Sequence, residues 1–328
     1  MVERALTKWL PGNSRRERIL VLLSFFAIYV IWGSTYLAIR YAVETIPPLF
    51  VAGTRHLVAG ALLFAWCWWK GLRPTLPQWR ASLILGALFF LGGHGLLHWA
   101  EQVVPSGLAA LLIATEPIMI AVMIAIAGQA RITWPVAVGM LLGLGGVALL
   151  IQGNMGHGRA ELIGSAAVLL GTISWSVGIM YSGKARLHPD PTMSAAMSLL
   201  CGALLLILTG LATGEGARLH PASISFVSFM NLLFLVFFGS LIAFTAYVWL
   251  LKRCPPTLVA THTYVNPIVA VLLGWAIAGE TISGRTLLAG TAVVIAIVLV
   301  GRGARKHPQP TKHGEQTHLE PASARRTA

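Results

Sequence analysis

Ten apolar runs, each about as long as a bilayer is thick, constrain this chain more than any other feature of its sequence. A helix needs roughly 20 apolar residues to cross ~30 Å of hydrocarbon. A closed barrel instead needs strands of ~10 residues with alternating polarity, whereas these runs are continuously apolar. The sequence therefore predicts an all-α integral membrane protein with ten transmembrane helices. The runs cover residues 19–40, 48–69, 81–99, 106–127, 133–151, 161–183, 192–213, 226–251, 256–278 and 284–302.

Composition and charge agree with a membrane protein and orient it. Of the 328 residues, 11% are charged, whereas a soluble domain has ~25% charged residues. With the N-terminus in the cytoplasm, 19 of the 24 lysines and arginines fall in cytoplasmic segments and 4 in outer loops. Because cytoplasmic loops carry the excess of Lys and Arg, both termini are predicted to be cytoplasmic. The net charge of +13 then reflects loops that face anionic lipid and requires no nucleic-acid partner.

The two ends of the chain differ in character from its apolar middle. Residues 1–18 are basic and precede an apolar run, as in a secretory signal peptide, but that run is about 20 residues long. A signal-peptide core has only about 7–15 residues, so we expect a cytoplasmic N-terminal segment and a retained first span. Residues 304–328 are polar and rich in Pro, Lys and His, which predicts a disordered cytoplasmic tail.

An internal repeat divides the chain into two halves. Thr115-Glu116-Pro117 and Val265-Asn266-Pro267 each lie inside a long apolar run, 150 positions apart. The halves, residues 19–152 and 161–303, contain five predicted spans each. Because five is odd, the second half must cross the membrane in the opposite direction to the first. The predicted architecture is therefore an inverted-topology repeat.

The two prolines mark the predicted binding site. A proline inside a span removes one helical hydrogen bond and frees a carbonyl group, so Pro117 and Pro267 are predicted helix breaks. Discontinuous spans at corresponding positions of two halves are the best sequence indication of a transporter's central site. Glu116 and Asn266 precede the prolines, which makes them candidate substrate-binding residues near the middle of the bilayer.

Two ionisable residues within spans have two open interpretations each. Charged groups at the centre of a span cost ~2.5–3.5 kcal/mol on insertion scales, and by default they indicate function. Arg55 lies ~10 Å below the outer end of its span; it either holds a substrate carboxylate or counter-ion, or snorkels outward or pairs permanently with an acid. Glu116 lies ~15 Å into its span. It either carries a proton or a cation, or forms a fixed pair with Arg55.

Histidine and aromatic side chains complete the candidate site. His94 and His98 share one helix face, but no further ligand completes a metal set nearby, so we expect hydrogen-bonded histidines and no metal. Trp32 and Trp175 occupy matched positions well inside their spans, which favours a cavity lining over an interfacial belt. The predicted substrate-binding residues are Trp32, Tyr36, Arg55, His94, Trp99, Glu116, Trp175, Tyr247, Tyr264 and Asn266.

Several segments resemble the EamA type of the drug/metabolite transporter superfamily. Residues 32–40 (WGSTYLAIR) are similar to its first-span signature, and residues 54–60 (TRHLVAG) are similar to its second-span arginine motif. Residues 99–112 (WAEQVVPSGLAALL) resemble the YedA-like branch, and Ala278-Gly279-Glu280 resembles the motif that follows the ninth span. The resemblance covers roughly residues 19–303. It implies two inverted five-helix repeats around a central cavity, and export of amino acids, metabolites or toxic compounds.

We therefore expect a multi-pass secondary transporter of a bacterial inner (plasma) membrane. It would export a small molecule by alternating access, with proton coupling through Glu116 as a hypothesis. Its partners would be the substrate and the lipid bilayer, with no cofactor. An integral membrane enzyme is the alternative, but no HExxH or GxSxG motif occurs. A channel is the second alternative, and no repeated ring of charged or carbonyl-rich segments is present. The sequence leaves the substrate, the coupling ion and the oligomeric state open.

Overall fold

A computed structural model describes residues 15–126, 133–154, 158–251, 253–254, 259 and 262–305. All regular secondary structure in these ranges is helical, with no strand among them, which confirms the predicted all-α class. Most of the two predicted terminal segments, residues 1–14 and 306–328, lies outside the described residues.

The helices of the first half follow the predicted apolar runs. Two of the runs form several consecutive helical segments without a loop between them, and the fourth run is interrupted. The segments are α2 (Arg15–Phe26), η1 (Ala27–Ile31) and α3 (Trp32–Ala42); α4 (Pro48–Trp69); α5 (Leu76–Leu85), η2 (Gly86–Gly95) and α6 (Leu96–Ala100); α7 (Ser106–Ile113) and α8 (Glu116–Ile126); and α9 (Trp134–Asn154).

The second half has long helices and one short helical connection. Its segments are α10 (Arg159–Ser182); α11 (Pro191–Ala212); α12 (Glu215–Arg218) and η3 (Pro221–Ser223); α13 (Phe226–Phe234), η4 (Leu235–Ile242) and α14 (Ala243–Leu251); α16 (His262–Ala278); and α17 (Gly284–Arg305). Within the described residues, seven helical stretches are long and apolar enough to cross a membrane, and three shorter apolar helices accompany them. This composition and helix length are those of an integral membrane protein.

The structure treats the two predicted helix breaks differently. In the fourth run, α7 ends at Ile113 and α8 begins at Glu116, so the helix is interrupted immediately before Pro117. At Pro267 the structure differs from our expectation, because α16 continues through the proline without interruption. A proline inside a span is tolerated where nearby side chains satisfy the freed backbone groups. The side-chain amide of the preceding residue, Asn266, oriented toward acceptors, lies 3.1 Å from the carbonyl oxygen of His262 in the same helix.

Three π-helical segments, η1, η2 and η4, lie within the first, third and eighth predicted spans. Such segments are rare and frequently occur at functional sites. In each of them a backbone carbonyl accepts a hydrogen bond from a side chain of a distant helix. Ser174 Oγ donates to Leu88 in η2 at 2.8 Å, and Trp32 Nε1 donates to Gly239 in η4 at 2.9 Å. The amide of Asn266 donates to two carbonyls of η1. Each π segment is therefore one of the places where a side chain of another helix binds the backbone.

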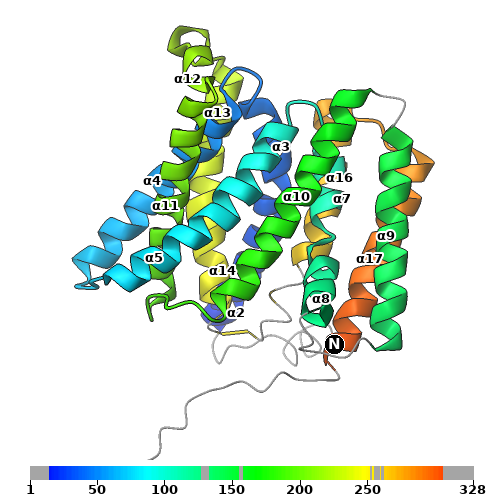
Figure 1. Cartoon of the computed structure of the whole chain (residues 1–328), viewed down its shortest axis with the longest axis horizontal. Helices are drawn as coiled ribbons and strands as arrows, with labels where there is room; N and C mark the ends of the chain where they lie inside the picture. The colour runs from blue at the N-terminus through cyan, green and yellow to red at the C-terminus, as the bar shows by residue number, and fades with distance from the viewer. Residues whose placement is uncertain are drawn as a thin grey trace, which may run out of the picture.

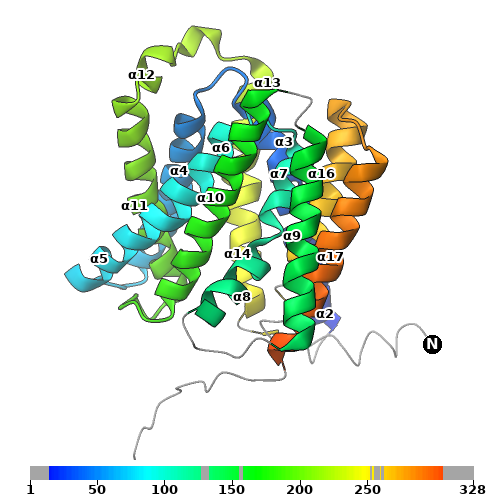
Figure 2. The same cartoon turned by 45° about the vertical axis from the view of Figure 1, so that its right-hand side comes forward.

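The packing pairs equivalent helices of the two halves. The most extensive contacts are those of α9 with α17 and of α4 with α11, and Figure 1 shows these pairs at opposite edges of the molecule. Figure 2 shows α10 and α14 in the region between them. α3 packs directly against α16: a Cβ atom at Gly33 would lie 2.6 Å from the Cβ of Val269. Small residues allow this close approach where lipid supplies no hydrophobic drive.

Replacing Trp32 by Phe should destabilise the protein. The change keeps most of the apolar ring but removes the donor to the Gly239 carbonyl, which lies in a π segment with no water to replace it. We expect the free energy of unfolding in lipid or mild detergent to fall by about 0.5–2 kcal/mol. Trp134→Phe is the matched control, because Trp134 is 80% exposed. Equal losses in the two variants would contradict the role of this hydrogen bond.

Candidate functional site

One face of α3 carries three of the residues that organise the centre of the bundle and one of its ends, which we call the outer end because the predicted topology places it outside. Trp32, Tyr36 and Arg40 are spaced four residues apart, which places them on the same helix face. Trp32 contacts η4, whereas Arg40, two turns later, forms an ion pair with Glu280 beyond the end of α16. Tyr36 lies between them. This stripe therefore connects the predicted central site with the outer end of the bundle.

An aromatic cluster, formed by Trp32, Tyr247 and His262, lies at the inner end of that stripe. The ring centroids are 5.2 Å apart for Trp32 and Tyr247, 5.1 Å for Trp32 and His262, and 5.8 Å for Tyr247 and His262. Asn266, one turn after His262, donates to Ile28 and Tyr29 of η1 at 3.0 and 3.1 Å. Predicted site residues from the first, eighth and ninth spans thus meet in one place.

A basic cluster, formed by Arg55, His56, His94 and His98, lies on α4, η2 and α6. Arg55 is buried, and its Nε donates to Ser240 Oγ of η4 at 2.9 Å. His94 Nδ1 lies 2.8 Å from His56 Nε2, and His98 Nδ1 lies 2.7 Å from the His94 carbonyl oxygen. Within the described part of the chain, no three His, Cys, Asp or Glu side chains are placed to hold a metal ion. Each histidine has one hydrogen-bonded ring nitrogen, whereas Nδ1 of His56 and Nε2 of His98 have no partner among the described residues.

Trp175 joins this cluster from α10. Its ring stacks on that of His94, with centroids 5.1 Å apart and an angle of 16° between the planes. The predicted residues Arg55, His94 and Trp175 therefore do come together, although they belong to three different helices. The sequence analysis did not select His56, which follows Arg55 directly, or Ser240. The sequence gives no sign that His56 contacts His94 or that Ser240 contacts Arg55.

Glu116 is the first residue of α8, directly after the interruption of the fourth span. It is close enough for its charge to act on the hydroxyl groups of Tyr36 and Tyr247. Among the described residues it forms no ion pair with Arg55, which bonds to Ser240 instead. The fixed Arg55–Glu116 pair, one of the two open interpretations of these residues, is therefore not formed in this structure.

Two other predicted site residues have different surroundings. Trp99 is 40% exposed near the outer end of the third span. Tyr264 belongs to α16, but its side chain is outside the described part of the structure.

The outer end of the bundle is closed by the carboxylate of Glu280. Its Oε1 accepts hydrogen bonds from Arg40 Nη1 at 2.5 Å, from the Ser106 amide at 2.9 Å and from Ser106 Oγ at 2.8 Å. Its Oε2 accepts from the Gly107 amide at 3.1 Å. Ser106 and Gly107 begin α7, where backbone N–H groups have no partner within the helix and the dipole attracts negative charge. One carboxylate of the second half therefore binds α3 and α7 of the first. We call the Arg40–Glu280 contact the outer closure.

The end of α16 places Glu280 there. Gly279 has φ +66°, in the left-handed region that ends many helices and favours glycine. The Glu280 amide then donates to the carbonyl of Gly274, six residues earlier, at 3.0 Å, which folds the chain back over the last turns of α16. At Gly274 itself, a Cβ atom would lie 2.8 Å from the carboxyl carbon of Glu280. Two glycines thus direct the acidic side chain back across the end of its own helix.

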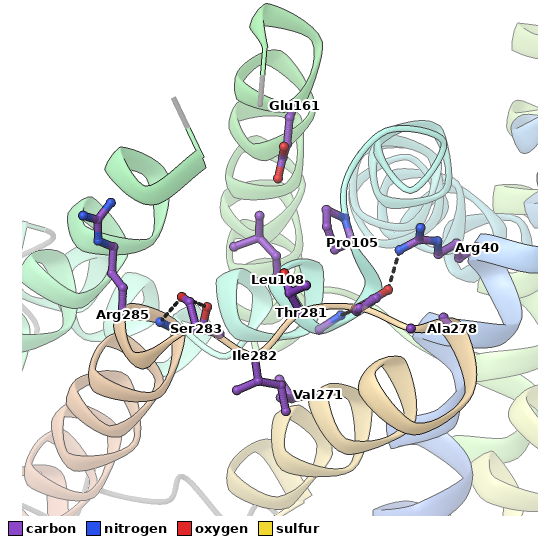
Figure 3. Close-up of a pocket in the computed structure, with 14 residues that line it drawn as sticks. Arg40, Pro105, Leu108, Glu161, Val271, Ala278, Thr281, Ile282, Ser283 and Arg285 are labelled. Atoms are coloured by element: carbon purple, nitrogen blue, oxygen red, sulfur yellow. Dashed lines mark hydrogen bonds and ion pairs between the residues drawn. The ribbon is translucent and has the colours of Figure 1, made fainter. Parts of the chain in front are cut away.

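Two cavities open beside this closure, and Arg40 and Pro105 line both of them. The larger, about 570 Å³, is also lined by Glu161, Val271 and Glu280. Figure 3 shows the ion pair of Arg40 at its edge, with Arg285 directed away from that pair. Val271 lies seven residues before the end of α16, so this cavity reaches ~10 Å into the bundle. Neither cavity is lined by Glu116 or Asn266.

The smaller cavity has a volume of about 390 Å³. Besides Arg40 and Pro105, its lining includes Glu101, Glu44 and Arg218. Glu101 is only 2% exposed. Sequence reasoning did not single it out, because it lies just beyond the end of a predicted span, where an acidic residue ordinarily faces water. It is nevertheless a buried carboxyl group beside the outer closure.

Comparison with known proteins places the chain among transporters. Residues 19–152 and 162–302 match the EamA-like transporter family. The chain belongs to this family. It is 38% identical over 298 residues to the inner membrane transporter YedA of Escherichia coli (strain K12), covering 89% of this chain and 94% of that protein. It is 28% identical over 296 residues to a probable amino-acid metabolite efflux pump of Salmonella typhimurium, covering 86% and 93%.

A solved crystal structure has the same fold. It superposes with a TM-score of 0.61 over 87% of this chain and 98% of that one, at 24% sequence identity. The family inferred from the motifs at residues 32–40 and 99–112 is thus confirmed, and the two matched segments of the family correspond to the two predicted halves.

The outer closure should be energetically coupled. A double-mutant cycle with Arg40→Gln and Glu280→Gln should give a coupling free energy of about 1–2 kcal/mol, measured by reversible unfolding in mild detergent. Hydrogen bonds to charged groups contribute about 1.5–3 kcal/mol, and the Arg40 side chain is 34% exposed, which reduces that value.

The pair Glu17–Arg253 is the control, because its atoms are 3.7 Å apart and both side chains are more than a third exposed. Such a surface pair contributes about 0–1 kcal/mol. A coupling at Arg40–Glu280 no larger than that of the control pair would show that the closure is not a stabilising contact.

Proposed function

We propose that this protein is a secondary transporter of a bacterial inner membrane that exports a small molecule by alternating access. The observation that carries the proposal is the convergence of polar side chains from both halves at the interrupted fourth span. There, Glu116 acts on Tyr36 of the first span and on Tyr247 of the eighth. Polar groups buried within a membrane bundle ordinarily mark a substrate or ion pathway.

The proposed architecture is ten spans in two inverted repeats, residues 19–152 and 161–303. It is supported by the pairing of α9 with α17 and of α4 with α11, which are the fifth and second spans of each half. It is also supported by η2 and η4, which lie in the corresponding third spans about 150 residues apart. In Figure 2 the start of α2 and the end of α17 lie toward the same side of the bundle, as expected if both termini are cytoplasmic.

Alternating access needs contacts that close each end in turn. Arg40 with Glu280 at the outer end, and Glu17 with Arg253 at the inner end, each connect the two halves. The outer pair is supported by three further hydrogen bonds to Glu280, whereas the atoms of the inner pair are 3.7 Å apart and both of its side chains are more than a third exposed. We infer that these two contacts form and break as the halves move against each other around the central residues. The name of one relative, a probable amino-acid metabolite efflux pump, supports export as the direction.

Ligand binding should identify the substrate class. Purified protein would be screened by thermal shift against amino acids, nucleosides and cationic drugs, because a ligand that binds the folded state raises its melting temperature. A compound that raises it should also be exchanged across sealed proteoliposomes in a counterflow assay. If the compound carries a carboxylate held by Arg55, Arg55→Ala should abolish its shift, whereas Arg285→Ala, at an exposed outer residue, should retain it. Saturable exchange supports a transporter, and non-saturable flux would instead indicate a channel.

Proton coupling through Glu116 is a separate part of the proposal. In proteoliposomes that hold the identified substrate, a substrate gradient should drive proton movement through the wild-type protein, and Glu116→Gln should abolish that movement while substrate exchange continues. The amide keeps the shape of the side chain but cannot release a proton. The measurement is fluorescence of a trapped pH indicator, with Glu44→Gln, at an exposed outer carboxylate, as the control. Unchanged proton movement in Glu116→Gln would reject Glu116 as the proton carrier.

A further inference from the structure

Glu101 is a buried carboxyl group with no side-chain hydrogen-bond partner among the described residues. Neither of its carboxyl oxygens makes a hydrogen bond of ordinary geometry, although the backbone of Arg40 lies close enough to favour the charged form, and the side chain is only 2% exposed. Such a group is costly unless something outside the protein binds it. Glu101 is also one of the residues that line the outer cavity of about 390 Å³, so only a small movement separates the carboxyl group from the space that water can fill.

The surroundings of Glu101 favour its neutral form. It follows α6 directly as the C-cap, where the helix dipole disfavours negative charge. Burial raises the pKa of Glu101 well above its ordinary value, and the negative charge of Glu280 raises it further. The positive charges of Arg40 and Arg55 lower it but do not offset burial.

The charged and titratable groups that face Glu101 come from several elements. Tyr36 and Arg40 lie on α3, Arg55 lies on α4 and Glu280 follows α16. Glu44 and Arg218 line the same cavity. Of these, Arg40 is the cation shared with the outer closure, so the charge state of Glu101 bears directly on the Arg40–Glu280 contact.

We propose that Glu101 is a proton-binding site that controls the outer closure. With a proton on Glu101, Arg40 has one carboxylate partner and remains on Glu280. When that proton leaves to water through the cavity, two carboxylates compete for one guanidinium group and repel each other. Glu280 then releases the start of α7, and the outer end opens. The proposal rests on the proposed transport function and adds the proton as a ligand of its outer face.

The proton balance of this step is simple. One proton passes from outer water to the carboxylate of Glu101, which becomes a carboxylic acid, and it returns to the same water when the acid ionises. No other reactant takes part. Glu116, the carboxyl group proposed to move protons through the centre, does not line either outer cavity. The two carboxyl groups therefore have separable roles, one at the closure and one in the centre.

The sign of the pH dependence follows from linkage. The closed state holds the proton more tightly than an open state in which Glu101 meets water, so closure is favoured at low pH. As the pH rises above the ordinary carboxyl range, the closed state loses stability relative to the open one. For one proton the opening equilibrium changes by at most tenfold per pH unit.

Hydrogen–deuterium exchange of the wild-type chain in nanodiscs, without substrate, tests the proposal. The amides of Ser106 and Gly107 donate to Glu280, and the amide of Glu280 donates to Gly274. Their protection factors, corrected for intrinsic exchange, should fall up to tenfold per unit between pH 5.5 and 7.5. Glu101→Gln, a permanently neutral side chain of the same shape, should keep them high and independent of pH.

Two controls make the outcome decisive. Glu44→Gln, at an exposed carboxylate of the same cavity, should retain the wild-type pH dependence of the protection factors. Glu101→Asp keeps a titratable group and should also show protection factors that depend on pH, which tests the proposal even if Glu101→Gln folds poorly. A pH profile that is flat in the wild type, or unchanged in Glu101→Gln, would overturn the proposal. Loss of protection at Ser106 and Gly107 without loss at the Glu280 amide would also overturn the proposal, because it would indicate fraying of α7. The assay contains no substrate, so its failure is distinct from a failure to find transport.

Discussion

The bilayer offers no water to backbone groups that lack a partner, and the contacts between the halves of this protein follow from that constraint. The π segments and the helix start at Ser106 each present such groups. Side chains from distant helices satisfy them: Ser174 at Leu88, Trp32 at Gly239, and Glu280 at the first amides of α7. Apolar contact with neighbouring helices could be exchanged for contact with lipid at little cost, whereas these directional bonds specify which helices meet and at what height.

The polar residues form a connected series from the outer cavities to the centre. Arg40, Tyr36 and Trp32 lie along one face of α3, so a single helix touches the closure, the two carboxyl groups and the aromatic cluster. Tyr36 is within the electrostatic range of both Glu101 and Glu116. Movement of α3 against the second half would therefore affect the outer closure and the central site together, which is the coupling that alternating access requires.

The two halves are alike in architecture but unequal in chemistry. Glu116 corresponds to Asn266, and Glu280 corresponds to Gln129, which lies outside the described residues. One member of each pair can carry a negative charge and the other cannot. The proposed ionic closure at one end and a neutral residue at the corresponding position of the repeat would make the two ends respond differently to pH, since only the ionisable member of each pair can change its charge.

The sequence by itself determined the helical class, the approximate spans, the family and the polar residues within the spans, because continuous apolar runs, proline positions and charge bias are local properties. Only the tertiary structure decided the partners. Arg55 bonds to Ser240 and not to Glu116, α16 continues through Pro267, and Glu101 is buried although it follows a span. These outcomes depend on which helices face one another. That arrangement is set by contacts between residues up to 240 positions apart, and no local pattern in the chain records them.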